Sequence, residues 1–86
     1  MTQITIYSKP GCMQCKQTAR VMTMKGIEFT YVEDVTLDDE GMAFMAQHGY
    51  RSLPAVRAGD DHWSGFNPAK IEEVAARLAA QTPEPC

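Results

Sequence analysis

Two cysteines three positions apart are the clearest chemical signal in this sequence. Cys12 and Cys15 lie in the stretch SKPGCMQCKQ, directly after an alternating apolar segment. A pair with this spacing can hold a metal ion, form a structural disulfide, or exchange electrons through a reversible disulfide. The other possible ligands, the cellular compartment and the element that carries the pair decide between these chemistries.

Metal binding and structural roles are the less favoured interpretations. A structural zinc site needs about four ligands, but His48, His62 and Cys86 are the only other histidines and cysteines, and none forms a second tight pair. Two inert core thiols do not suit a turn that leads into a helix. A structural disulfide needs an oxidising compartment, whereas the N-terminus resembles neither a signal peptide nor a membrane span. We therefore expect a cytoplasmic protein, and a metal-binding module that uses Cys12 and Cys15 is retained as an alternative.

Electron exchange fits the expected position of the pair best. If Cys12 begins a helix, the unpaired N–H groups and the helix dipole favour its thiolate, and Lys9 and Lys16 add positive charge within one turn. An ordinary thiol, with a pKa of about 8.5, is only a few per cent ionised at neutral pH. We expect Cys12 to attack a substrate disulfide, and the more buried Cys15 to attack Cys12 and release the reduced substrate.

The pattern of residues predicts the elements that position this pair. Residues 4–7 alternate as a strand and end in a turn, and residues 12–25 contain neither proline nor glycine and favour a helix. Residues 28–35 are rich in β-branched and aromatic types and predict a second strand. A capping-box pattern at residues 36–39 begins a helix predicted over 37–48.

The second half of the chain predicts a hairpin and a helix. Residues 54–57 and 62–63 form its two strands around a glycine turn. Asn67-Pro68 begins the last helix, and its apolar stripe consists of Ile71, Val74, Ala75, Leu78 and Ala79. The order βαβαββα predicts an α/β fold, with a small four-stranded mixed sheet and helices on both of its faces.

Length and charge limit the remaining possibilities. The chain has 86 residues, which allows one domain, expected over residues 1–80 with a loose tail at 81–86. The net charge of −3 does not indicate nucleic acid or membrane partners. The charges are nevertheless segregated, because residues 1–27 contain four Lys or Arg residues and no acid, whereas residues 28–50 contain six acids and no Lys or Arg.

A strand, a C-x-x-C pair at the mouth of the next helix and a proline that opens a later strand together resemble the thioredoxin superfamily. The short chain is similar to glutaredoxin, and the resemblance extends from Thr2 to about Ala80. It implies a thioredoxin fold in which Pro54 is cis and lies beside the active disulfide. It also implies that the backbone of Leu53 pairs with bound substrate.

The finer resemblance is to the NrdH-redoxins, which are glutaredoxin-like proteins. It depends on the segment Cys12-Met13-Gln14-Cys15 and on Trp63-Ser64-Gly65-Phe66 followed by Pro68. The family usually has arginine and aspartate where this chain has Asn67 and Ala69. Without the resemblance, Trp63 and Phe66 are expected to be core aromatics. The resemblance implies instead that they form an exposed rim for partner recognition. The residues expected to contact substrate or partner are Lys9, Met13, Gln14, Leu53, Pro54, Trp63, Ser64, Gly65 and Phe66.

This resemblance also implies the electron source and the electron acceptor. Thioredoxin reductase, which draws on NADPH, would reduce the Cys12-Cys15 disulfide of a monomeric protein that binds no cofactor. The dithiol would then reduce the large subunit of class Ib ribonucleotide reductase. A glutathione-dependent glutaredoxin is the alternative, but such proteins generally have Pro-Tyr between the cysteines and Gly-Gly after the fourth strand. Here Met13-Gln14 and the segment Trp63-Ser64-Gly65-Phe66 stand instead.

Overall fold

The computed structural model describes residues 3–59 and 61–81 of the chain. The elements follow the predicted order βαβαββα, and one short 3-10 turn, η1 (Val35–Leu37), precedes the second helix. The strands are β1 (Ile4–Tyr7), β2 (Thr30–Val32), β3 (Ala55–Ala58) and β4 (Asp61–Ser64), and the helices are α1 (Met13–Met24), α2 (Asp39–His48) and α3 (Pro68–Gln81).

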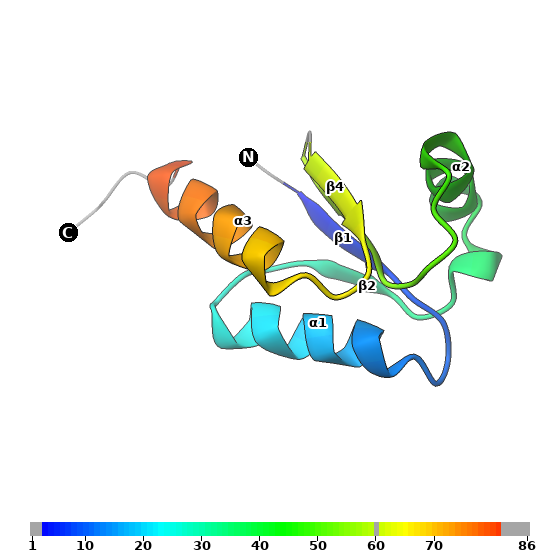
Figure 1. Cartoon of the computed structure of the whole chain (residues 1–86), viewed down its shortest axis with the longest axis horizontal. Helices are drawn as coiled ribbons and strands as arrows, with labels where there is room; N and C mark the ends of the chain where they lie inside the picture. Colours follow the sequence, from blue (N-terminus) through cyan, green and yellow to red (C-terminus); the bar gives the residue numbers. More distant parts are fainter. Residues whose placement is uncertain (1–2, 60, 82–86) are drawn as a thin grey trace.

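The four strands form one mixed sheet in the order β2-β1-β3-β4. β1 and β2 are parallel, whereas the β1–β3 and β3–β4 pairs are antiparallel. Figure 1 shows α1 and α3 together on one side of the sheet and α2 set apart from them. This arrangement confirms the predicted thioredoxin fold.

Each face of the sheet has its own hydrophobic cluster. The larger one lies under α1 and α3, and its buried members are Ile4, Ile6, Met22, Ile27, Val56, Ala58, Trp63, Ile71 and Val74. The smaller one lies under α2, and its buried members are Tyr7, Val35, Phe44 and Ala55. Because strand side chains alternate between faces, β1 supplies residues to both clusters and is the centre of the core.

A glycine allows α2 to pack closely on the sheet. Gly41 is buried in the first turn of α2, and a Cβ atom placed there would lie 2.7 Å from Cδ1 of Tyr7 and 2.8 Å from Cγ2 of Val35. Distances this short are severe overlaps. The absence of a side chain at Gly41 is therefore what permits this distance between helix and sheet.

The segment before α2 differs from the prediction. β2 has three residues instead of the eight expected. The predicted capping box at Thr36 is wrong, because Thr36 lies within η1 and the N-cap of α2 is Asp38. Asp34 caps η1, because its Oδ1 accepts a hydrogen bond from the N–H of Thr36 at 3.0 Å. Asp38 caps α2 by accepting from the N–H of Gly41 at 2.7 Å. The two aspartates therefore begin two separate elements, a short turn at residues 35–37 and a helix that starts at Asp39, two residues after the predicted start.

The last helix begins as predicted, since Oδ1 of Asn67 accepts a hydrogen bond from the N–H of Lys70 at 3.2 Å. The ammonium of Lys70 also lies 2.8 Å from Oδ2 of Asp61, which connects α3 to β4. α3 includes Gln81, and the remainder of the predicted tail, with Cys86, lies outside the described residues. None of the helices among the described residues is long and apolar enough to cross a membrane.

Candidate active site

Three segments that are far apart in the sequence meet at one end of the sheet. Tyr7, the last residue of β1, pairs with Ala55, the first residue of β3, and Ala55 pairs in turn with Ser64, the last residue of β4. The cysteine turn therefore follows β1 at the same end at which Pro54 precedes β3. The segment after β4 also leaves from this end, and the topology thus brings both motifs of the sequence together.

Cys12 and Cys15 are joined by a disulfide at the amino end of α1. Their Cα atoms are 5.3 Å apart. Cys12 is the N-cap of the helix, and its Sγ accepts a hydrogen bond from the backbone N–H of Cys15 at 3.2 Å. Cys12 retains 9% of its surface whereas Cys15 retains none, so Cys12 is the sulfur nearer to solvent.

The turn before Cys12 and the residues between the cysteines are open to solvent. Lys9 and Lys16 are both exposed, and the carbonyl of Lys9 accepts a hydrogen bond from the N–H of Cys12 at 3.2 Å. Met13 is 77% exposed, which confirms that it projects from the surface between the cysteines. A substrate that approaches Cys12 therefore meets a flexible apolar side chain flanked by lysines.

Pro54 is buried, and the Leu53-Pro54 peptide bond is cis, as the resemblance implies. Its carbonyl accepts a hydrogen bond from the N–H of Gly65 at 2.7 Å, and Gly65 has a φ of +86°, which favours glycine. This bond attaches the segment after β4 to the start of β3. Leu53 is half-buried beside it.

Gln14 connects the cysteine helix to that same segment. Its Oε1 accepts a hydrogen bond from the N–H of Phe66 at 3.4 Å, although the two residues are 52 positions apart. The carbonyl of Gln14 accepts a second bond, from the buried hydroxyl of Thr18, at 2.9 Å. Sequence analysis identified both motifs but not this contact, for which the sequence contains no local signal.

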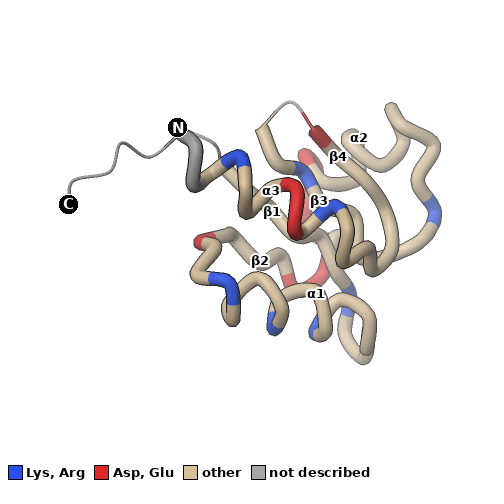
Figure 2. Tube along the Cα trace, turned by 60° about the vertical axis from the view of Figure 1, so that its left-hand side comes forward, with Lys and Arg blue, Asp and Glu red and all other residues tan. Residues whose placement is uncertain are grey.

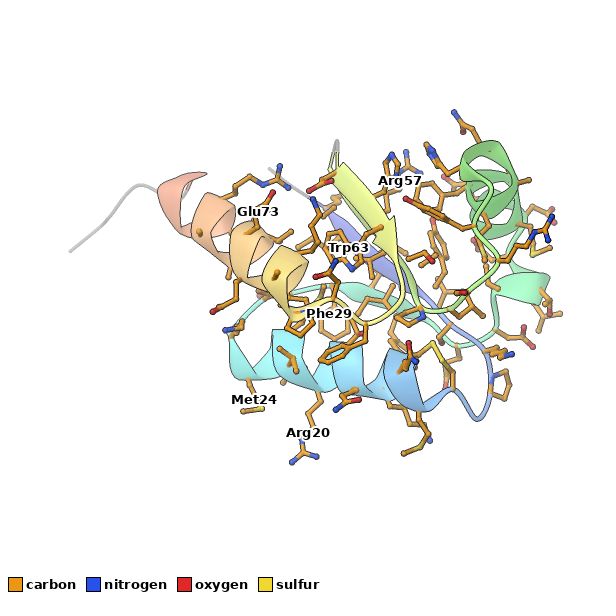
Figure 3. All side chains as sticks on the ribbon, in the orientation of Figure 1. Arg20, Met24, Phe29, Arg57, Trp63 and Glu73 are labelled. Carbon is orange, nitrogen blue, oxygen red and sulfur yellow. A yellow bond between two sulfur atoms is a disulfide. The ribbon has the colours of Figure 1, made fainter. Side chains whose placement is uncertain are left out.

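The predicted exposed rim is wrong for Trp63. Its side chain is only 6% exposed and belongs to the larger hydrophobic cluster. In Figure 3, Trp63 and Phe29 point into the layer between the sheet and the helices α1 and α3. Phe66 is partly buried against the same cluster, whereas Ser64 and Gly65 keep part of their surface. Alternation explains the difference, because Trp63 pairs with the buried Val56 and shares its face of the sheet.

A second group of titratable side chains, which sequence analysis did not bring together, lies on the α2 face. The ring centroids of His48 and His62 are 3.9 Å apart, and the Tyr50 hydroxyl shares a hydrogen bond of 2.6 Å with Nδ1 of His62. The guanidinium of Arg57 lies 5.6 Å from the centre of the Phe44 ring in the same group. These residues come from α2, β3, β4 and the loop that follows α2, so only the fold assembles them.

This group makes stability depend on pH. Partial burial, then the charges of His62 and Arg57, lower the pKa of His48 below its ordinary value of about 6.5. The folded protein therefore binds this proton at lower pH than the unfolded chain. We expect the free energy of unfolding to be highest above about pH 6.5 and to fall as the pH drops from there to the lowered pKa of His48.

Urea unfolding between pH 5 and 8 measures this dependence, and an NMR titration measures the pKa of His48 directly. His48→Gln should flatten the change in stability around pH 6, with carboxylate titration as the remaining slope. A His48 that titrates above pH 6.5 in the parent protein would contradict the prediction.

The described residues 3–59 and 61–81 contain no group of three or more His, Cys, Asp or Glu side chains placed to hold a metal ion. Within that part of the chain, the pair has no additional ligands around it. The chemistry that its geometry supports is the making and breaking of the Cys12–Cys15 bond.

Comparisons with known proteins agree with this geometry. A family model described as glutaredoxin matches residues 4–63. The glutaredoxin-like protein NrdH of Salmonella typhimurium is 44% identical over 71 residues, which cover 83% of this chain and 86% of the relative. The NrdH protein of Escherichia coli is 40% identical over 72 residues, which cover 84% and 88% of the two chains.

A glutaredoxin-like protein and a glutaredoxin are also among the solved structures that superpose on this chain. The NrdH-redoxin of Escherichia coli superposes with a TM-score of 0.76 at 36% identity, over 96% of this chain and 99% of that one. A glutaredoxin from Archaeoglobus fulgidus superposes with a TM-score of 0.67 at 25% identity, over 86% of each chain.

Proposed function

Because this chain belongs to the glutaredoxin family and is an NrdH-like thiol–disulfide oxidoreductase, we propose that it carries electrons from thioredoxin reductase to class Ib ribonucleotide reductase. NADPH is the source of these electrons, which reach this protein through the reductase. The acceptor is the large subunit of ribonucleotide reductase. The protein acts as a cytoplasmic monomer whose single domain spans residues 1–80.

The reaction divides between the two sulfurs according to their positions. In the reduced protein the Cys12 thiolate lies at the amino end of α1, where free N–H groups and the helix dipole favour negative charge. It attacks one sulfur of the substrate disulfide, forms a mixed disulfide and releases the other sulfur as a thiol. Cys15 then attacks Cys12, which frees the second substrate thiol and forms the Cys12–Cys15 disulfide. Two electrons pass from the protein to the substrate.

The segment between the cysteines carries the preference for thioredoxin reductase. The side-chain oxygen of Gln14 accepts a hydrogen bond from the N–H of Phe66, so this backbone donor is not free for a small ligand such as glutathione. The similar NrdH-redoxin of Escherichia coli is described as having a thioredoxin-like activity profile. Both observations support reduction by thioredoxin reductase rather than by glutathione.

We assign partner contact to the residues around the disulfide, which except for Pro54 keep all or part of their surface exposed, and a supporting role to Trp63. The backbone of Leu53 receives an extended segment of the partner, because Pro54 has no N–H and its carbonyl already accepts a hydrogen bond from Gly65. The contact residues proposed are Lys9, Met13, Gln14, Leu53, Pro54, Ser64, Gly65 and Phe66. Trp63 acts from the core by holding the last of these segments in place.

A coupled assay tests the electron source. The oxidised protein is mixed with insulin as substrate and NADPH, together with either thioredoxin reductase or glutathione plus glutathione reductase, and NADPH oxidation is recorded. We expect turnover with thioredoxin reductase alone. Turnover only with glutathione would overturn the proposal and favour a glutathione-dependent glutaredoxin.

The electron acceptor is tested separately. Class Ib ribonucleotide reductase is assayed with this protein, thioredoxin reductase and NADPH as the only reducing system. We expect deoxyribonucleotide formation that saturates with the concentration of the protein. If the protein reduces insulin but no deoxyribonucleotide forms, the oxidoreductase activity would stand and ribonucleotide reductase would be ruled out as its acceptor.

A further inference from the structure

The outward side of α1 carries positive charge that no ion pair among the described residues neutralises. α1 contains Lys16 and Arg20 but no Asp or Glu, and both basic residues are exposed. Within the described residues neither has an ion-pair partner, whereas Lys25, just after the helix, is paired with Glu72 of α3. Figure 2 shows the basic positions along α1, with no acidic position on that helix. The charge is therefore available to a partner.

Two exposed methionines share this side of the helix. Met13 and Met24 are each 77% exposed. Positions 13, 16, 20 and 24 are separated by three or four residues, which places them in one row along the helix. In Figure 3, Arg20 and Met24 point away from the sheet. We call the row of Met13, Lys16, Arg20 and Met24 the α1 outer face.

The charge and apolar content of this face define a kind of partner. The α1 outer face begins at Met13, between the two cysteines, so a protein whose disulfide reaches Cys12 extends over this face. Methionine is adaptable and suits contact with more than one partner, and the unpaired cations favour carboxylates. The nearby acidic residues Glu33 and Asp34 do not belong to the α1 outer face, because they follow β2. The carboxylate of Asp34 is also already used to cap η1.

We propose that the α1 outer face selects substrate proteins whose disulfide is flanked by acidic residues. The proposal rests on the proposed oxidoreductase function and specifies its substrate class. Steering by charge of this kind acts on the rate of encounter more than on the final affinity.

Distance along the helix sets the expected order of contributions. Each residue adds about 1.5 Å, so Lys16 is about 6 Å and Arg20 about 12 Å along the axis from Cys12. At physiological ionic strength, screening acts over about 8 Å. Lys16 should therefore contribute most and Arg20 less. Lys25, about 20 Å away and already paired with Glu72, should contribute almost nothing.

Synthetic peptides test the proposal directly. Three peptides of equal length carry one intramolecular disulfide, flanked entirely by Glu, by Gln or by Lys. In each reaction the dithiol protein becomes the Cys12–Cys15 disulfide and the peptide disulfide becomes a dithiol, and stopped flow gives the second-order rate constant. We expect the Glu peptide to be reduced about tenfold or more faster than the Lys peptide at low salt. This ratio should approach one in 1 M salt, where screening acts over about 3 Å.

The variants Lys16→Gln and Arg20→Gln, alone and combined, should lower the Glu-to-Lys rate ratio, and Lys25→Gln is the matched control that leaves it unchanged. The ratio is informative because any change in the reactivity of Cys12 affects both peptides equally and cancels. A Glu-to-Lys rate ratio near one in the parent protein would overturn the proposed selection. A high ratio that is unchanged in the double variant would overturn it as well. Failure to reduce even the Gln peptide would instead contradict the oxidoreductase function itself.

Discussion

A Cys15→Ser variant is expected to stop halfway through its reaction and to accumulate a mixed disulfide between Cys12 and its substrate. Cys12 is the sulfur that retains exposed surface and caps the helix, so it remains able to attack. Without Cys15 there is no neighbouring thiolate to release the product. Mass spectrometry after incubation with a disulfide peptide should detect protein plus one peptide chain, whereas Cys12→Ser should give no such adduct.

The loss of turnover in Cys15→Ser should be large. In this variant an external thiol must replace the intramolecular attack by Cys15, and effective molarities for well-oriented intramolecular groups reach about 10⁵ M or more. With about 1 mM external thiol, the resolving step should therefore slow well beyond 10³-fold.

Both variants are best made in a Cys86→Ser background, because Cys86 is a third thiol that could form an unrelated adduct. That background protein is the control and should turn over as the parent does. Peptide mapping locates the adduct in the trapped variant. Trapping by Cys12→Ser through Cys15 would reverse the assigned roles of the two sulfurs.

Local signals in the sequence were sufficient for the order of elements. Asn67-Pro68 and the apolar stripe predicted α3, and the hairpin followed from Gly59 and the short strands on either side of it. The same kind of signal was misleading before α2, because several residues there can cap a helix. Asp34 and Asp38 accept the capping hydrogen bonds there in place of Thr36, and Val35 is buried in the smaller hydrophobic cluster.

The site could be predicted where its chemistry is local. The spacing of Cys12 and Cys15 and their place after a strand predicted a redox pair at a helix start, and the pair lies there. The contact between Gln14 and Phe66 joins residues 52 positions apart, and the stacked rings of His48 and His62 come from α2 and β4. Such contacts depend on how the elements pack, which no local pattern contains.

Trp63 shows how alternation in a strand could have corrected a family-based expectation. The neighbours of Trp63 in β4 are His62 and Ser64, both polar and both partly exposed, so the strand pattern itself favours a buried Trp63. The described residues offer no hydrogen-bond partner to its indole Nε1. The ring thus contributes through its apolar surface and through the ammonium of Lys70, which lies 5.8 Å from its centre, rather than through its N–H.

Trp63→Ala is expected to lower the free energy of unfolding by about 3–5 kcal/mol, the usual cost of removing a large aromatic side chain from a core. A domain of this size has only about 5–15 kcal/mol in total, so the variant should be close to unfolding at physiological temperature. Trp63→Phe is the matched control. It keeps a ring in the cluster, removes the unpartnered N–H and should cost less than about 2 kcal/mol.

Urea unfolding of the oxidised proteins, followed by far-ultraviolet circular dichroism, compares the variants without relying on tryptophan fluorescence. The decisive comparison is between stability and rate. If Trp63 supports the fold from the core, Trp63→Phe should reduce a disulfide peptide at nearly the parent rate. Trp63→Ala should have a clearly lower free energy of unfolding, and any loss of rate should follow from that loss of stability. An Ala variant of nearly parental stability that reacts slowly with protein partners would instead place the indole at the recognition surface.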